Sequence, residues 1–179
     1  MESFVWNECF VTGLPSVDEQ HERLVELINR FGDGLMQARD VSPVQLEAVF
    51  SELADYARFH FRDEEALMAQ HTVDLRYQTL HQREHQHFLL EVSRLHDSLH
   101  SSDPAAATRL QQFLVDWLAY HILGSDHDLA RQIEAIDSGT SPDEAYRTRR
   151  RARDPATSTL LMSLDRLFHH VSERNRELM

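Results

Sequence analysis

The chain has 179 residues, enough for one domain with a sizeable core and an appended segment. Its 30 acidic and 18 basic residues give a formal charge of −12, which argues against a general surface for nucleic acids or anionic membranes. Glycine and proline are scarce, at five each, which favours an all-helical protein. The one cysteine, Cys9, excludes an intramolecular disulfide.

No stretch of the sequence approaches the roughly 20 apolar residues that a membrane-spanning helix needs. Residues 1–8 carry acidic side chains and lack the apolar core of a signal peptide. We therefore expect a cytoplasmic protein without a membrane partner.

The first predicted helix runs from about Ser16 to Leu35, with Ser16 as its N-cap and Glu19 completing a capping box. Its apolar positions alternate four and three residues apart, as in a bundle helix, and His21 lies in that stripe. Taken alone, a histidine there is more often a hydrogen-bonded core residue than a metal ligand. An arm over residues 1–15 precedes this helix. Its apolar side chains are expected to lie along the bundle: Phe4, Val5, Trp6, Phe10, Val11 and Leu14.

The second predicted helix covers residues 43–70, with Ser42 as N-cap and proline at the first helical position. Its buried stripe turns from apolar to ionisable at His60 and Glu64, which lie one turn apart on the same face. A lone carboxylate in that stripe is costly to bury unless it binds a cation. The adjacent Glu65 is expected to be exposed to solvent.

The third predicted helix, about Leu75 to Leu99, carries a similar pair, His81 and His85, within its apolar stripe. Imidazole suits iron, zinc, copper and nickel, and a carboxylate among imidazoles favours iron or a pair of metals. The remaining histidines of this region fall off the stripe or its level and are expected at the surface: His71, His87, His96 and His100.

The fourth predicted helix, capped by Asp103 and ending near Ile136, contains a shift in its periodicity. His121 continues the apolar stripe, but Asp126 is five residues further on, which on an α-helix places it roughly 140° away. The spacing of three and four resumes when counted from Asp126. The pattern therefore predicts one extra residue between these two positions, absorbed as a π-bulge, a feature that often marks functional sites.

Five histidines and two carboxylates thus lie on the apolar faces of the four predicted helices, at a similar level along the bundle. Each unsatisfied polar group in an apolar core costs on the order of a kcal/mol or more, so packing alone does not explain seven of them. The constellation predicts a metal site made of His21, His60, Glu64, His81, His85, His121 and Asp126.

Over residues 4–136 this pattern resembles the hemerythrins, specifically the bacterial hemerythrin-like proteins. The motifs that carry the resemblance are one histidine in the first helix, His-x3-Glu, His-x3-His and His-x4-Asp. The resemblance implies an up-down-up-down four-helix bundle with two iron ions, of which one has an open position for O2. It also implies an oxo or hydroxo bridge between them.

By this resemblance, one iron would be held by His81, His85 and His121, the other by His21 and His60, and both carboxylates would bridge the pair. No catalytic residue is implied, since the domain binds O2 and is not an enzyme. The connection between the second and third helices departs from the family because it lacks a Tyr-Pro pair. The O2 pocket implied by the resemblance is apolar: Leu24, Phe61, Trp117, Leu118 and Ile122.

The predicted bundle ends at residue 136, residues 137–157 are expected to form a linker, and a further helix is expected over 158–179. Its apolar repeat is that of a parallel coiled coil, with Asn175 in the seam, so we expect a homodimer through this helix. The segment is also similar to signalling helices that precede diguanylate cyclase domains. The tail therefore favours an O2- or redox-sensing domain that signals to a downstream output domain.

Two other functions compete with the sensor. A ferritin-like diiron oxidase uses two Glu-x-x-His motifs, and this sequence does not supply them. A stand-alone O2 store or carrier, or an iron-handling hemerythrin, would need only the bundle and stays open.

Overall fold

The computed structural model describes residues 4–36, 42–100 and 105–148. The predicted N-cap Asp103 and the predicted coiled-coil helix over 158–179 lie outside these ranges.

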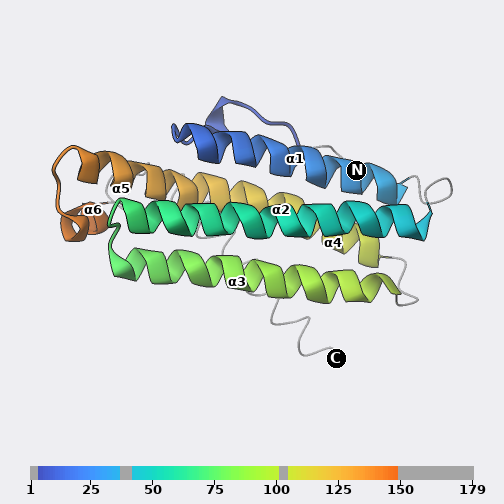
Figure 1. Cartoon of the computed structure of the whole chain (residues 1–179). Helices are drawn as coiled ribbons and strands as arrows, with labels where there is room; N and C mark the ends of the chain where they lie inside the picture. Colours follow the sequence, from blue (N-terminus) through green and yellow to red (C-terminus); the bar gives the residue numbers. More distant parts are fainter. Residues whose placement is uncertain (1–3, 37–41, 101–104, 149–179) are drawn as a thin grey trace.

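Four antiparallel helical rods form an up-down-up-down bundle (Figure 1), which confirms the predicted fold class. The first three rods are single helices, and the fourth is interrupted by a π-helical segment, called here the π-turn. Among the described residues, no helix combines the length and hydropathy needed to cross a bilayer. The elements are α1 (Pro15–Met36), α2 (Pro43–Gln70), α3 (Leu75–Asp97), α4 (Ala106–His121), the π-turn (Ile122–Asp126), α5 (His127–Asp137) and α6 (Pro142–Thr148), with short 3-10 helices at Glu8–Phe10 and Ser98–His100.

The starts of α1 and α2 show one wrong and one correct prediction. Ser42 caps α2 in a capping box with Gln45, as the Ser-Pro pair indicated. The capping box predicted at Ser16 is wrong, because α1 begins one residue earlier, at Pro15. The carboxylate of Asp18 accepts hydrogen bonds from the Thr12 and Gly13 backbone N–H groups, which fixes the turn before the helix. Pro15 therefore occupies the first helical position.

The N-terminal arm lies along α1 as expected, though not with all its apolar residues. Phe4 and Phe10 are buried and contact each other edge to face. The Asn29 side chain holds the arm by accepting from the Phe4 N–H and donating to the Phe4 carbonyl. Val5 and Val11 are exposed instead, at 69% and 44%.

The apolar core is divided into two clusters along the bundle. The larger one contains residues of all four rods and lies around Phe31, Phe88 and Leu114. The smaller one lies near the α2–α3 turn and contains Met68, Val73, Tyr77, Leu129 and Ile133. The buried histidine and carboxylate residues singled out in the sequence lie at or next to the boundary between these two clusters on each rod.

Part of the segment predicted as a linker is the helix α6, which packs against the end of the bundle at the α2–α3 turn (Figure 1). Arg76, at the start of α3, pairs with Asp143 of α6 at 2.6 Å, and its guanidinium lies 4.3 Å from the centre of the Tyr146 ring. Tyr146 also packs against the smaller apolar cluster. His71 after α2 contacts Asp137 at the end of α5 at 2.9 Å.

The α2–α3 turn places Thr72 in the left-handed region, with φ of +53°. This conformation costs an L-residue roughly 1–2 kcal/mol, while glycine adopts it freely at an entropic cost of roughly 0.5–1 kcal/mol. We expect Thr72→Gly to raise the free energy of unfolding by about 1 kcal/mol in chemical denaturation. Thr72→Ala keeps the Cβ and is the matched control; equal stabilisation by both variants would contradict this account.

Candidate metal centre

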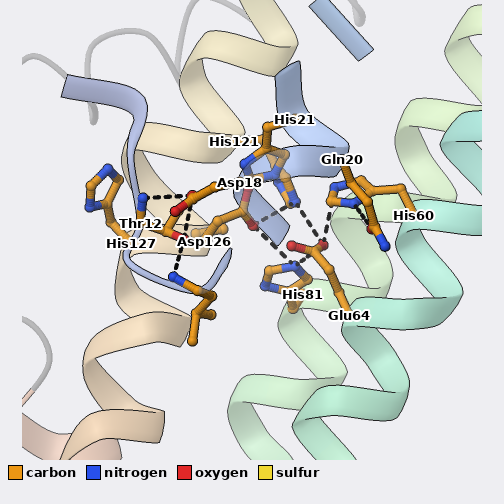
Figure 2. A network of polar contacts seen from close by, with 12 residues as sticks. Thr12, Asp18, Gln20, His21, His60, Glu64, His81, His121, Asp126 and His127 are labelled. Carbon is orange, nitrogen blue, oxygen red and sulfur yellow. Dashed lines mark hydrogen bonds and ion pairs between the residues drawn. The ribbon is translucent and has the colours of Figure 1, made fainter. Parts of the chain in front are cut away.

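The seven residues singled out in the sequence converge on one point inside the bundle, and each is at most 2% exposed. Figure 2 shows all of them except His85. They come from all four rods: one from α1, two each from α2 and α3, and two from the interrupted fourth rod. The helical spacing of four residues places each α2 and α3 pair on one face, as predicted.

Glu64 lies between two groups of possible ligands. In one group its ligand atom is within 4.8 Å of those of His81, His85 and His121, and in the other of those of His21 and His60. Its Oε2 atom is 3.2 Å from His85 Nε2 and 3.3 Å from His81 Nε2. A single carboxylate therefore serves both groups.

Asp126 makes the same kind of contact from the opposite side. Its Oδ2 atom lies 3.1 Å from His21 Nε2, while its Oδ1 atom lies 3.2 Å from His121 Nε2. The two oxygens of one carboxylate thus face different histidine groups. This is the geometry that a carboxylate needs to bridge two metal ions.

The π-turn brings Asp126 into the cluster. His121 ends α4, the π-helical segment spans Ile122–Asp126, and both ionisable side chains are fully buried. The predicted π-bulge is therefore confirmed: the additional residue removes the roughly 140° rotation that a regular α-helix would impose. The Tyr77 hydroxyl supports the turn by donating a hydrogen bond to the Ser125 carbonyl.

Many of the possible ligand atoms in the cluster have no hydrogen-bond partner in the described part of the chain. Buried atoms without a hydrogen-bond partner among the described residues include both ring nitrogens of His21, Nε2 of His60, one oxygen of Glu64 and both of Asp126. The Nε2 atoms of His85 and His121 face each other at 3.1 Å, where two neutral imidazoles cannot both donate. Nitrogen and carboxylate donors that point inward without protein partners fit metal cations.

The electrostatic field of the cluster also suits cations. Burial lowers the pKa of His60 to about 3 and that of His85 to about 3, so both rings are neutral and present a lone pair at physiological pH. Burial also opposes a charge on His121, but Asp126, Glu64 and Glu84 outweigh it and raise the pKa of His121 well above its usual value. A field that favours a proton at this ring equally favours a metal cation.

Four polar residues behind the histidines were not identified as site residues from the sequence. Gln20 Oε1 lies 2.9 Å from His60 Nδ1, and the Tyr77 hydroxyl lies 3.2 Å from His81 Nδ1. Glu65 Oε1 is 3.2 Å from His85 Nδ1, so the expectation that Glu65 is simply exposed is wrong: it faces the neighbouring helix. Glu84 Oε2 lies 3.3 Å from His121 Nδ1, a distance typical of an ion pair, although the angle is not that of a hydrogen bond.

The predicted O2-pocket residues lie next to the cluster and are all buried. Phe61 stacks on His85 with ring centres 4.0 Å apart, and Trp117 stacks on His121 at 4.3 Å. Ile122 is fully buried beside them in the π-turn. A cleft of about 440 Å³ between α2 and α3 is lined by Phe61 and His85, at the edge of the cluster. The other pocket residues are Leu24 and Leu118.

Two of the histidines predicted to lie outside the site have other partners. His96 stacks on Phe50 at 3.7 Å and contacts Glu47, and His71 contacts Asp137. His87 belongs to neither ligand group found among the described residues.

Comparison with known proteins agrees with this geometry. The family model described as hemerythrin HHE cation binding domain matches residues 12–133. A bacteriohemerythrin of Pseudomonas aeruginosa is 30% identical over 126 residues, which cover 70% of this chain and 78% of that protein. One from Clostridium acetobutylicum is 27% identical over 127 residues, covering 70% of this chain and 97% of that protein. A hemerythrin-like protein of Naegleria gruberi is 32% identical over 123 residues, which cover 69% of this chain and 87% of that protein.

The family match extends over more than half of the chain and includes all seven clustered residues. The chain therefore belongs to the hemerythrin family, whose members are binding proteins that hold a pair of iron ions and take up O2.

Proposed function

We propose that the seven clustered residues hold the iron pair of this domain. His81, His85 and His121 bind one iron, His21 and His60 bind the other, and Glu64 and Asp126 bridge them. The observation that carries this assignment is the pair of carboxylates that each face both histidine groups. When bound, the iron pair supplies the electrons that O2 accepts on binding.

The protein's own residues prepare that site in two ways. Acceptors at Nδ1 hold the proton of His60, His81 and His85 on the outer nitrogen and leave the Nε2 lone pair for iron. The buried rings and side chains around the cluster, among them Phe61 and Ile122, exclude water and stray protons. Dry surroundings favour reversible O2 binding over irreversible oxidation of the iron.

The ligand assignment predicts two iron ions per chain. Glu64→Ala removes the carboxylate shared by both groups, so we expect it to hold one iron or none. His87→Ala is the matched control on α3 and should keep both. Metal analysis beside the visible absorption spectrum measures this. One zinc ion per chain in the unmodified protein, or loss of iron in His87→Ala, would contradict the assignment.

The O2 pocket predicts that Ile122→Ala accelerates oxidation of the reduced, iron-loaded protein in air, because the smaller side chain admits water next to the cluster. Leu110→Ala is the control: it is equally buried on the same rod, roughly 18 Å away along the helix, and should leave the rate unchanged. Both variants should lose about 2–5 kcal/mol of stability. An unchanged rate in Ile122→Ala would indicate access through the α2–α3 cleft.

We further propose that residues 1–136 form the sensor part of a cytoplasmic signalling protein. In this proposal residues 137–157 connect the bundle to a dimerising helix that starts near residue 158 and leads to an output domain such as a diguanylate cyclase. Two observations support it. His121 and Asp126 lie on the rod that continues through α5 into α6, and α6 contacts the α2–α3 turn through Arg76.

A stand-alone O2 store or carrier, or an iron-handling protein, is the competing function. Its requirements are met by residues 1–136 alone. The coiled-coil repeat of residues 158–179 favours the sensor, because a store has no use for a helix that pairs two chains.

The sensor proposal predicts that oxidising the iron changes the pairing of the C-terminal helices. A spin label at Arg166→Cys, in a Cys9→Ser background, reports the distance between the two chains. We expect different distance distributions in the reduced and oxidised proteins, and no difference in Asp126→Ala, which lacks the bridging carboxylate. The same distribution in both states of the unmodified iron site would leave the storage function.

A further inference from the structure

The outer ring nitrogens (Nδ1) of the histidines have different neighbours in the two groups of possible ligands. Behind the group of three histidines stand two carboxylates, Glu65 at His85 and Glu84 at His121. The third ring of that group, His81, faces the Tyr77 hydroxyl. Glu84 is held in place by a hydrogen bond from the Ser125 hydroxyl in the π-turn.

Neutral groups stand behind the other half. His60 faces the side-chain amide of Gln20, which in turn donates to the exposed Asp63. Nδ1 of His21 has no hydrogen-bond partner among the described residues. The nearest carboxylate behind His60 is therefore one hydrogen bond further away and in contact with solvent, where its charge is screened.

The two carboxylates behind the first group keep their negative charge uncompensated by arginine. Within the described part of the chain, the ion pairs of Glu65 and Glu84 involve only His85 and His121. The nearby Arg58 pairs with Asp55, and Arg62 donates to a backbone carbonyl. Only about a third of the Glu65 side chain and a quarter of the Glu84 side chain are exposed, so water screens them incompletely.

We propose that Glu65 and Glu84 are positioning residues that make the iron site of His81, His85 and His121 prefer the ferric state more than the site of His21 and His60. This rests on the ligand assignment proposed above. Glu65 faces Nδ1 of His85 at hydrogen-bond distance, and a carboxylate that accepts the Nδ1–H of a bound imidazole makes that ring a stronger donor. Glu84 adds negative charge 3.3 Å from Nδ1 of His121. Both effects stabilise a trivalent ion more than a divalent one. The bundle thereby adds to the difference between the two iron ions that the unequal number of histidines already creates.

The test compares Glu65→Gln and Glu84→Gln, which keep size and an acceptor oxygen but remove the charge. Glu22→Gln is the control, because Glu22 adjoins a ligand, His21, yet is exposed on the outside of α1. Iron content and midpoint potential are measured on the iron-loaded chain. We expect two iron ions in all three variants and a higher potential in the first two only. A tenfold fall in the ferric-to-ferrous affinity ratio corresponds to about 59 mV for one electron.

Two iron ions with an unchanged potential in both Gln variants would overturn the inference and leave the ligand assignment intact. An unmodified chain that binds no iron would instead refute the assignment. Loss of an outer partner commonly weakens metal binding about 10–100-fold, so a variant that loads poorly is titrated with manganese(II) and gallium(III). A greater loss of affinity for gallium(III) than for manganese(II) supports the charge effect. Equal losses of affinity for the two ions would show only that the histidine ring is no longer held in its orientation, and would overturn the inference.

Discussion

The dominant constraint in this protein is the desolvation of seven ionisable side chains inside an apolar bundle. Removing a charged group from water without a partner costs several kcal/mol, and several inward-facing nitrogen and oxygen atoms of the cluster have no hydrogen-bond partner among the described residues. Cations bound between these atoms would satisfy them. The rest of the architecture follows from the same need, because each of the four rods contributes to the cluster and the apolar residues before and after it hold the rods in register.

Much of this arrangement could be predicted from the sequence, for a physical reason. Helix periodicity places residues four apart on one face, so the His60–Glu64 and His81–His85 pairs were recognisable without any tertiary information. The π-turn was predictable because the apolar rhythm before His121 and after Asp126 cannot share one α-helical register. The local signal at Ser42 and Pro43 sufficed for the start of α2 because capping involves only neighbouring residues.

The parts that could not be predicted depend on contacts between helices. Glu65 and Glu84 each follow or precede a buried cluster residue in the sequence, but each contacts a histidine of a neighbouring rod, and only the packing of the rods reveals which. The start of α1 depends on Asp18 reaching back to the arm. The helix α6 has a polar, unremarkable sequence and is stabilised by Arg76 and the smaller apolar cluster.

The contact of α6 with the α2–α3 turn also has a mechanical consequence. Any tension on the backbone after Thr148 is resisted first by the Arg76–Asp143 pair and by Tyr146 against its apolar neighbours, before it reaches α5. The same contacts join α6, which follows the fourth rod, to the start of α3, so a force on α6 is shared between these two rods before it acts on Asp126.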